Sequence, residues 1–173
     1  MKKVIIALML CNLGTAWAQT IDATKSYVAF SISKLVVNTV EGQFTGMTGK
    51  VKFNESNPLK SSFDVCVDAS TVKTDSEKRD KHLKTEDFFH VTKFPNICFK
   101  SKKVVKTDAG YSVEGSLTMI GVTKNVSIPF SYANKTLTGN FIVKRGDFNL
   151  APSKGALQIG EEVTLKIVCT LQD

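Results

Sequence analysis

The sequence has few of the residues that carry most enzyme chemistry. Of its 173 residues only four are cysteine, two are histidine and one is tryptophan. His82 and His90 lie eight positions apart with no cysteine or third histidine nearby, which is not the ligand spacing of a zinc site. The Gly-x-Ser-x-Gly turn of serine hydrolases, a Gly-rich phosphate loop and a Cys-x-x-Cys pair are all absent. We therefore expect no enzyme, no cofactor and no metal site.

Long apolar runs are also scarce, and the clearest one lies at the start of the chain. Lys2 and Lys3 precede an apolar stretch over residues 4–13, and the small-residue sequence Ala16-Trp-Ala18 follows it. This order of charged, apolar and small residues is typical of a secretory signal peptide. The apolar stretch is too short to cross a bilayer as a helix. We predict that residues 1–18 are a signal peptide that is removed on export.

The chain that remains after export is one domain in length. Cleavage after Ala18 leaves residues 19–173, which is 155 residues, enough to bury a core and still enclose a cavity. The alternative of a lipoprotein anchored at Cys11 lacks support, because Leu10 stands where that cleavage needs a small residue. We predict a single domain over residues 19–173 and a periplasmic location.

Positive charge is mild and spread along the chain. Loss of Lys2 and Lys3 lowers the formal net charge from +7 to +5. A solvated surface accounts for such a charge, and an attraction to anionic headgroups or to a membrane surface is the sharper alternative. No recognised nucleic-acid module is present, so we expect no nucleic-acid partner. The sequence leaves open a transient contact with a membrane surface.

Alternation of apolar and polar residues dominates the exported chain and predicts about eight strands. The segment 75–84 alone predicts a helix, with Asp75 or Thr74 as its cap and Glu77 in the first turn. Many strands with almost no helix are typical of a β-sandwich or a β-barrel, and alternation does not separate the two. The alternating runs are 28–32, 51–53, 61–73, 97–99, 111–119, 126–130, 137–143 and 163–167.

The three cysteines of the exported chain fall on different faces of these strands. Cys66 and Cys98 alternate out of phase with their apolar neighbours, which places both thiols on polar faces. Cys169 instead shares the apolar phase of the last strand, so we predict a buried free thiol there. Export places all three in a compartment that permits disulfides.

A series of short motifs follows one another in a fixed order along the chain. The sequence 59–101 contains Arg79-Asp-Lys-His-Leu83, the pair Phe88-Phe89 and then Phe94-Pro-Asn-Ile-Cys-Phe99. Around it lie Ser26–Phe30, Gly42–Phe44, Gly115–Lys124, Arg145–Phe148 and Ile159–Leu165. This ordered set, which spans roughly the whole exported chain, resembles the YceI-like family of periplasmic polyisoprenoid-binding proteins.

The resemblance implies an all-β fold, an eight-stranded antiparallel lipocalin-like barrel with one short helical segment near residues 75–84. In that family the strands that carry Cys66 and Cys98 lie close together, so we predict a disulfide between them. The barrel interior would hold the tail of a long lipid without catalysis. The expected apolar lining is Phe30, Ile32, Phe44, Phe53, Val65, Val67, Phe89, Phe99, Leu117, Met119, Ile128, Phe130 and Phe141.

Polar residues near the barrel ends are candidates for a headgroup site or a lid. Lys25 and Lys34 stand where relatives often carry histidine, and lysine there would favour a phosphate or a carboxylate. Arg79 and His82 belong to the predicted helical segment, which we expect to cover one barrel end. Arg145 would meet an anionic headgroup or pair structurally with Asp147.

We predict a binding protein whose partner is a long-chain isoprenoid or fatty-acyl lipid. Relatives often pair, which leaves a homodimer open. One alternative is a structural or stress-response factor that acts through its outer surface and has a merely packed core. Another is an enzyme acting on lipids, for which the sequence offers serine and threonine but no obvious base beside them.

Overall fold

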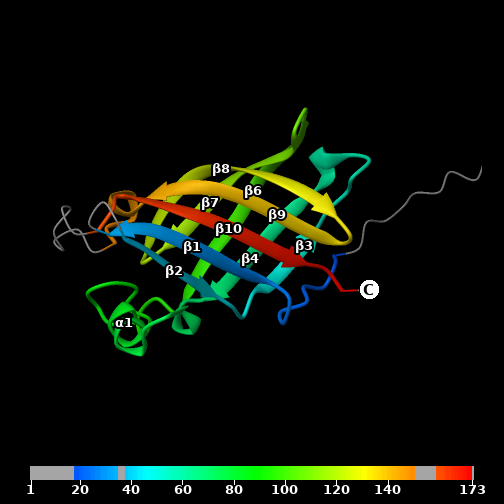
Figure 1. Ribbon diagram of the computed structural model, residues 1–173. Helices are drawn as coiled ribbons and strands as arrows, with labels where there is room; N and C mark the ends of the chain where they lie inside the picture. Colours follow the sequence, from blue (N-terminus) through cyan, green and yellow to red (C-terminus); the bar gives the residue numbers. More distant parts are fainter. Residues whose placement is uncertain (1–17, 35–37, 151–158, 173) are drawn as a thin grey trace, which may run out of the picture.

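The computed structural model describes residues 18–34, 38–150 and 159–172, so the predicted signal peptide lies almost wholly outside it. Within these ranges one antiparallel sheet, in the order β3-β4-β6-β7-β8-β9-β10-β1-β2-β5, forms the fold (Figure 1). Its strands are β1 (Tyr27–Lys34), β2 (Asn38–Phe44), β3 (Thr48–Lys52), β4 (Ser62–Asp68), β5 (Lys73–Thr74), β6 (Asn96–Thr107), β7 (Gly110–Met119), β8 (Val122–Ala133), β9 (Thr136–Lys144) and β10 (Glu162–Thr170).

The expected all-β, antiparallel fold is confirmed, but the sheet has ten strands in the described residues rather than eight. The alternation that would have indicated β2 is interrupted by Gly42, so that strand gave little signal. The long run expected over 61–73 is divided in two. β4 ends at Asp68, whose carboxylate accepts a hydrogen bond from the backbone N–H of Ser70 at 2.7 Å. This starts the 3-10 turn η2 (Ala69–Thr71), after which β5 begins.

The sheet curls because the chain passes twice between its two margins. Residues 45–47 join β2 to β3, and η2 joins β4 to β5, although β3 and β5 are the two edge strands. Three residues span only about 10 Å when fully extended, so the margins must approach each other. The Thr71 hydroxyl holds both crossings: it accepts from the N–H of Thr45 at 2.9 Å and donates to the carbonyl of Asp68 at 2.6 Å.

Helical structure is confined to short segments. The helix α1 (Glu77–Leu83) forms where the sequence predicted it, but Ser76 caps it rather than Asp75 or Thr74, because the Ser76 hydroxyl accepts from the N–H of Arg79. Two further 3-10 turns are η1 (Pro58–Lys60) and η3 (Arg145–Phe148). Among the helices in the described ranges, none has the length and apolar character that crossing a membrane would require.

One end of the curled sheet is filled by aromatic rings. The ring of Phe53 lies 5.1 Å from Tyr111 and 5.8 Å from Phe130, both edge to face, and 4.8 Å from Tyr132. Phe63 adds an edge-to-face contact with Phe130 at 5.7 Å. Such pairs add to the stabilisation that burial alone provides. We call these five residues the aromatic plug.

The three cysteines behave as the sequence predicted. Cys66 and Cys98 are register partners on β4 and β6, and they form a disulfide with a Cα–Cα distance of 4.1 Å. Cys169 is a buried free thiol, 5% exposed. Burial in apolar surroundings raises the pKa of this thiol to about 11, and a hydrogen bond with Ser26 opposes the rise only in part.

Candidate functional site

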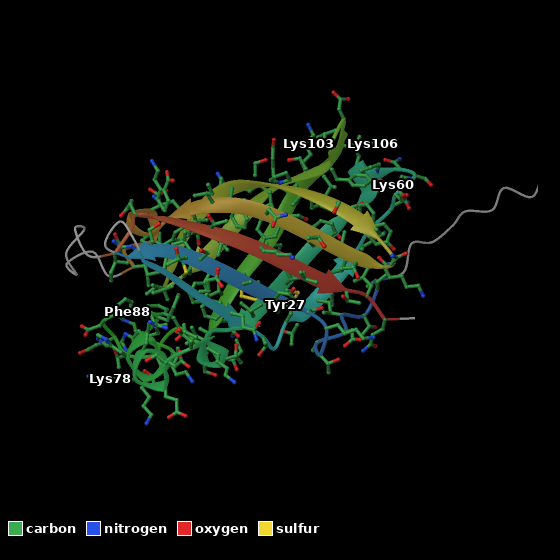
Figure 2. The ribbon with its side chains drawn as sticks, in the orientation of Figure 1. Tyr27, Lys60, Lys78, Phe88, Lys103 and Lys106 are labelled. Carbon is green, nitrogen blue, oxygen red and sulfur yellow. A yellow bond between two sulfur atoms is a disulfide. The ribbon has the colours of Figure 1, made fainter. Side chains whose placement is uncertain are left out.

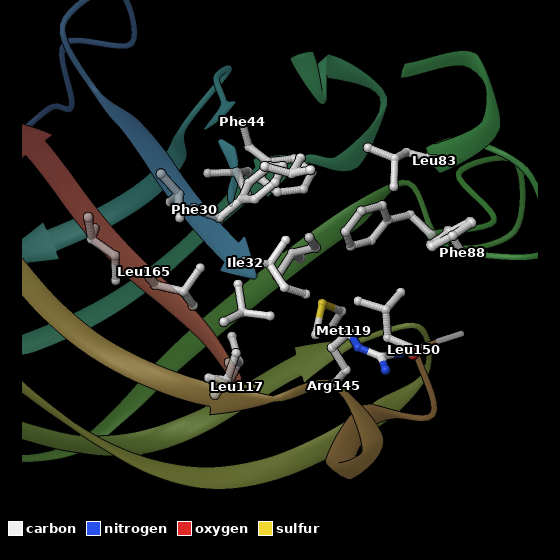
Figure 3. Close-up of a pocket in the computed structure, with 18 of the residues that line it drawn as sticks. Phe30, Ile32, Phe44, Leu83, Phe88, Leu117, Met119, Arg145, Leu150 and Leu165 are labelled. Atoms are coloured by element: carbon white, nitrogen blue, oxygen red, sulfur yellow. Dashed lines mark hydrogen bonds between the residues drawn. The ribbon is translucent and has the colours of Figure 1, made fainter. Parts of the chain in front are cut away.

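The end of the sheet opposite the aromatic plug encloses a cavity of about 1100 Å³. Inward-facing residues of β1, β2, β4, β6, β7, β9 and β10 form its wall. Residues 77–89, which contain α1 and which we call the α1 segment, lie with η3 at its outer end (Figure 3). A volume of this size is at the upper end of the range for small-molecule pockets. The apolar residues that border it include Val28, Val40, Met47, Val143, Val163, Leu165 and Ile167.

Ten of the thirteen predicted lining residues border this cavity. The other three, Phe53, Ile128 and Phe130, are buried at the filled end, where Phe53 and Phe130 belong to the aromatic plug. The residues in the wall are Phe30, Ile32, Phe44, Val65, Val67, Phe89, Phe99, Leu117, Met119 and Phe141. Alternation gives the face of each strand correctly here, but it does not give the depth of a residue along the barrel axis.

Sequence reasoning left out two parts of the wall. The alternating residues of β10, such as Leu165, carried the same signal as the residues that were chosen and could have been included. Leu150 follows η3 and Ile159 precedes β10, so both lie outside the strands, where no periodicity marks an inward side chain.

The α1 segment covers the outer end of the cavity. Leu83 and Phe88 lie across the cavity from Leu165 (Figure 3). The ring of Phe89, 7% exposed, packs edge to face on Phe44 of β2 at 5.2 Å. These apolar contacts hold the segment over the outer end of the cavity, the position that the sequence predicted for it.

Polar contacts tie the α1 segment to the edge of the sheet. The carboxylate of Asp80 accepts from both the N–H and the hydroxyl of Thr74, at 2.8 and 2.5 Å. The guanidinium of Arg79 donates to the same hydroxyl at 3.0 Å and pairs with Asp75. Asp80 therefore binds the α1 segment to Thr74 of β5, and Arg79 binds it to Thr74 and to Asp75.

Most of the basic residues of the α1 segment border the cavity, and none of its acidic residues does. Lys78, Arg79, Lys81 and His82 border it, whereas Lys84, Glu77, Asp80, Glu86 and Asp87 do not. Lys78 lies at the opposite end of the molecule from Lys60, Lys103 and Lys106 (Figure 2). The side chain of His82 is half exposed and lies 3.0 Å from the Asp87 carboxylate. The outer end of an apolar cavity thus has a cationic rim, which we define as Lys78, Arg79 and Lys81, and His82 borders the cavity beside them.

Arg145 also borders the cavity, but its hydrogen bonds go to the backbone around η3. The side chain is 6% exposed, and it donates to the carbonyls of Gly160 and Leu150, each at 2.8 Å. Its ion pair is with Glu161 at 3.6 Å rather than with Asp147. These bonds fix the chain on both sides of residues 151–158, and they make Arg145 chiefly a structural residue of the cavity wall.

Of the two lysines expected at a headgroup site, the structure describes only the side chain of Lys25, and it is not placed there. Lys25 does not border the cavity; its ammonium is exposed and pairs with Asp22 at 3.1 Å. The hydroxyl of Thr24, and then Lys25, lower the pKa of Asp22 to about 2. The side chain of Lys34 lies outside the described residues. In the described ranges no cluster of three or more histidine, cysteine or carboxylate side chains could hold a metal ion.

Comparisons with known proteins agree with this architecture. A family model described as "YceI-like domain" matches residues 19–171. The UPF0312 protein YE1254 of Yersinia enterocolitica is 31% identical over 156 residues, covering 84% of this chain and 81% of its own. A UPF0312 protein of Yersinia pestis is similar to the same extent.

Solved structures share the fold. BcnA of Burkholderia cenocepacia has a TM-score of 0.78 at 24% identity, over 86% of this chain and 98% of its own. The YCEI protein of Campylobacter jejuni has a TM-score of 0.69 at 25% identity, over 79% and 87%. A polyisoprenoid binding domain of Saccharophagus degradans, implicated in plant cell wall breakdown, has a TM-score of 0.67 at 15% identity, over 88% and 96%.

Proposed function

The chain belongs to the YceI-like family, and from this membership and the cavity we propose that it is an exported, periplasmic binding protein for a long-chain amphiphilic lipid. The tail, an isoprenoid or a similar acyl chain, lies in the cavity, and the headgroup lies at the cationic rim. The protein acts by binding and shielding the lipid, with no chemical step. The observation that carries this proposal is the large apolar cavity at one end of the curled sheet.

The size of the cavity suits a long chain. Since liquid water takes about 30 Å³ per molecule, and a methylene group is of similar size, 1100 Å³ holds roughly 35 such groups. Each methylene that leaves water contributes about 0.8 kcal/mol at best. A tail of this length therefore binds tightly with few polar contacts, which fits a wall that is almost wholly apolar.

The charge on the rim favours an anionic headgroup. Lys78 and Lys81 are exposed cations that border the cavity. A phosphate or carboxylate at the outer end of the tail would come within reach of both ammonium groups without being buried. This rim takes the place of Lys25, which the sequence predicts at the headgroup but which does not border the cavity.

A role through the outer surface alone, with a packed core, is favoured less by this architecture. That alternative predicts that the inward-facing residues fill the interior, as the aromatic plug does at one end. The cavity at the other end supports binding instead. The disulfide, which needs an oxidising compartment to form, supports export.

Native mass spectrometry of the protein, exported in its own host and purified without detergent, tests the proposal. We expect a stoichiometric adduct that solvent extraction identifies as a long isoprenoid or acyl lipid. Replacement of Lys78 and Lys81 by glutamine should lower the affinity for an anionic lipid more than the affinity for the corresponding alcohol. Lys103→Gln, at the other end of the molecule, is the control. A protein that stays free of lipid when candidate lipids are added would refute the binding role.

A further inference from the structure

Two glycines occupy inward-facing positions at the end of the sheet that contains the cavity, which we call the hollow end. Gly42 lies between Val40 and Phe44 on β2, and Gly115 lies between inward-facing residues of β7. Neither has a positive φ, so the backbone at both positions is of a kind that any residue adopts. Backbone conformation therefore does not explain why these positions are glycine. Both belong to the short motifs that mark the family resemblance, Gly42–Phe44 and Gly115–Lys124.

The space beside each glycine is filled by a phenylalanine ring from a neighbouring strand. A Cβ atom at Gly42 would lie 2.4 Å from Cζ of Phe30, its register partner on β1. A Cβ atom at Gly115 would lie 2.4 Å from Cζ of Phe99 on β6. Both distances are well below van der Waals contact, so neither ring could keep its place beside a larger residue. The same Cβ atoms would also approach a backbone carbonyl oxygen, that of Lys73 at 2.8 Å and that of Lys100 at 2.5 Å, and these contacts press a larger residue further toward the ring. Phe30 and Phe99 border the cavity, whereas neither glycine does, because a ring covers each.

The filled end shows the contrasting arrangement. Gly139 on β9 is the register partner of Phe130, yet a Cβ there would meet Cγ2 of Ile128 at 3.0 Å and only Cβ of Phe130, at 3.7 Å. The Phe130 ring does not lie over this glycine; it stacks on Tyr111 at 5.3 Å inside the aromatic plug. At the end with the cavity, a ring lies over each of the two glycines. At the end with the aromatic plug, the ring of Phe130 instead points into the interior.

We propose that Gly42 and Gly115 are specificity-determining residues of the cavity, which hold the rings of Phe30 and Phe99 flat against the wall and so set how long an apolar chain the cavity accepts. This inference rests on the proposed lipid-binding function. With a larger residue at either position, the ring beside it turns into the cavity and takes the volume that distal units of the ligand occupy. Short chains still fit, and long chains lose their place.

A chain-length profile tests this inference. The delipidated wild-type protein and the Gly42→Ala variant are titrated with geraniol, farnesol and geranylgeraniol, and the bound fraction is measured by native mass spectrometry. We expect G42A to lower the affinity for geranylgeraniol by about tenfold or more and to change the affinity for geraniol by less than about threefold. In the double variant F30L/G42A the shorter leucine removes the clash with the ring, while the 2.8 Å approach to the Lys73 carbonyl is the same as in G42A, so binding of geranylgeraniol should recover relative to G42A. Gly139→Ala, at the filled end, should leave the profile unchanged.

The outcomes separate the inference from the function on which it rests. If the wild-type protein binds no isoprenol or acyl chain, the proposed function fails and the inference fails with it. If the wild type binds and folded G42A keeps its chain-length profile, only the inference fails. Should G42A not fold, Phe99→Leu introduces no clash and uncovers the space beside Gly115; it should shift the preference toward longer chains, and an unchanged profile would overturn the inference.

Discussion

The two ends of this sheet are built from the same alternating strands, yet one is solid and the other hollow. At the solid end five rings of the aromatic plug contact each other at centroid distances between 4.8 and 6.3 Å. At the hollow end the rings of Phe30 and Phe99 lie over glycines and border the cavity of about 1100 Å³. The number of aromatic residues does not distinguish the ends; the direction of their rings does.

This difference indicates how one domain reconciles stability with a large cavity. A cavity removes packing partners and lowers stability in proportion to its volume. The solid end supplies packed rings, whereas the hollow end is held by the Cys66–Cys98 disulfide and by the anchors of the α1 segment. Stability and binding are therefore assigned to separate regions, and variants in each region should affect different measurements.

The largest effect on folding should come from the aromatic plug. Phe53→Ala removes a ring that contacts four others, and we expect it to lower the free energy of unfolding by about 3–5 kcal/mol. Phe141→Ala, in the cavity wall, should cost only about 1–2 kcal/mol because one side of that ring faces the cavity, which has no packing partners to lose. Urea unfolding followed by circular dichroism measures both, and equal losses would contradict the division into two regions.

The disulfide should stabilise the end of the sheet with the cavity more than the end with the aromatic plug. It closes a loop with a sequence separation of 32, so replacing both Cys66 and Cys98 by alanine should cost about 3 kcal/mol. Hydrogen exchange should then show the largest loss of protection in β4 and β6, which border the cavity. Cys169→Ala, which keeps the disulfide, is the control. A loss of protection spread evenly over both ends would argue against local stabilisation.

The sequence predicted the fold class, the disulfide and the faces of the strands, because period-two alternation and motif order report these directly. It did not predict β2 or the break after Asp68, since a glycine hid the first and a side-chain cap made the second. It placed Phe53 and Phe130 in the cavity wall because alternation is blind to position along the barrel axis. Lys78 and Lys81 were missed because a short helix gives no signal for which of its charges face a cavity.

A smaller effect, on kinetics, is expected at the α1 segment. Asp80→Ala removes both hydrogen bonds to Thr74 and should weaken the anchor of the α1 segment by about 1–2 kcal/mol. If the segment must move for the lipid to leave, dissociation should be faster by roughly tenfold, with little change in global stability. Stopped-flow displacement of a bound lipid measures this rate, and Glu86→Ala, on the same segment but away from the cavity, is the control. An unchanged rate would show that the lipid leaves by another route.

The last variant tests whether water reaches the buried thiol of Cys169 on β10, and its effect is confined to alkaline pH. Burial raises the pKa of the Cys169 thiol from its ordinary value of 9.0 to about 11. Between these values the thiol is protonated in the folded chain and ionised in the unfolded chain, so its contribution to stability is fully present below pH 9 and is lost as pH rises toward 11. The Cys169→Ala variant lacks this pH-dependent contribution to stability, while it has every other titrating group in common with the wild type. The urea midpoint of the wild type should therefore fall more steeply with rising alkaline pH than that of the variant, and parallel curves would mean that water reaches the thiol.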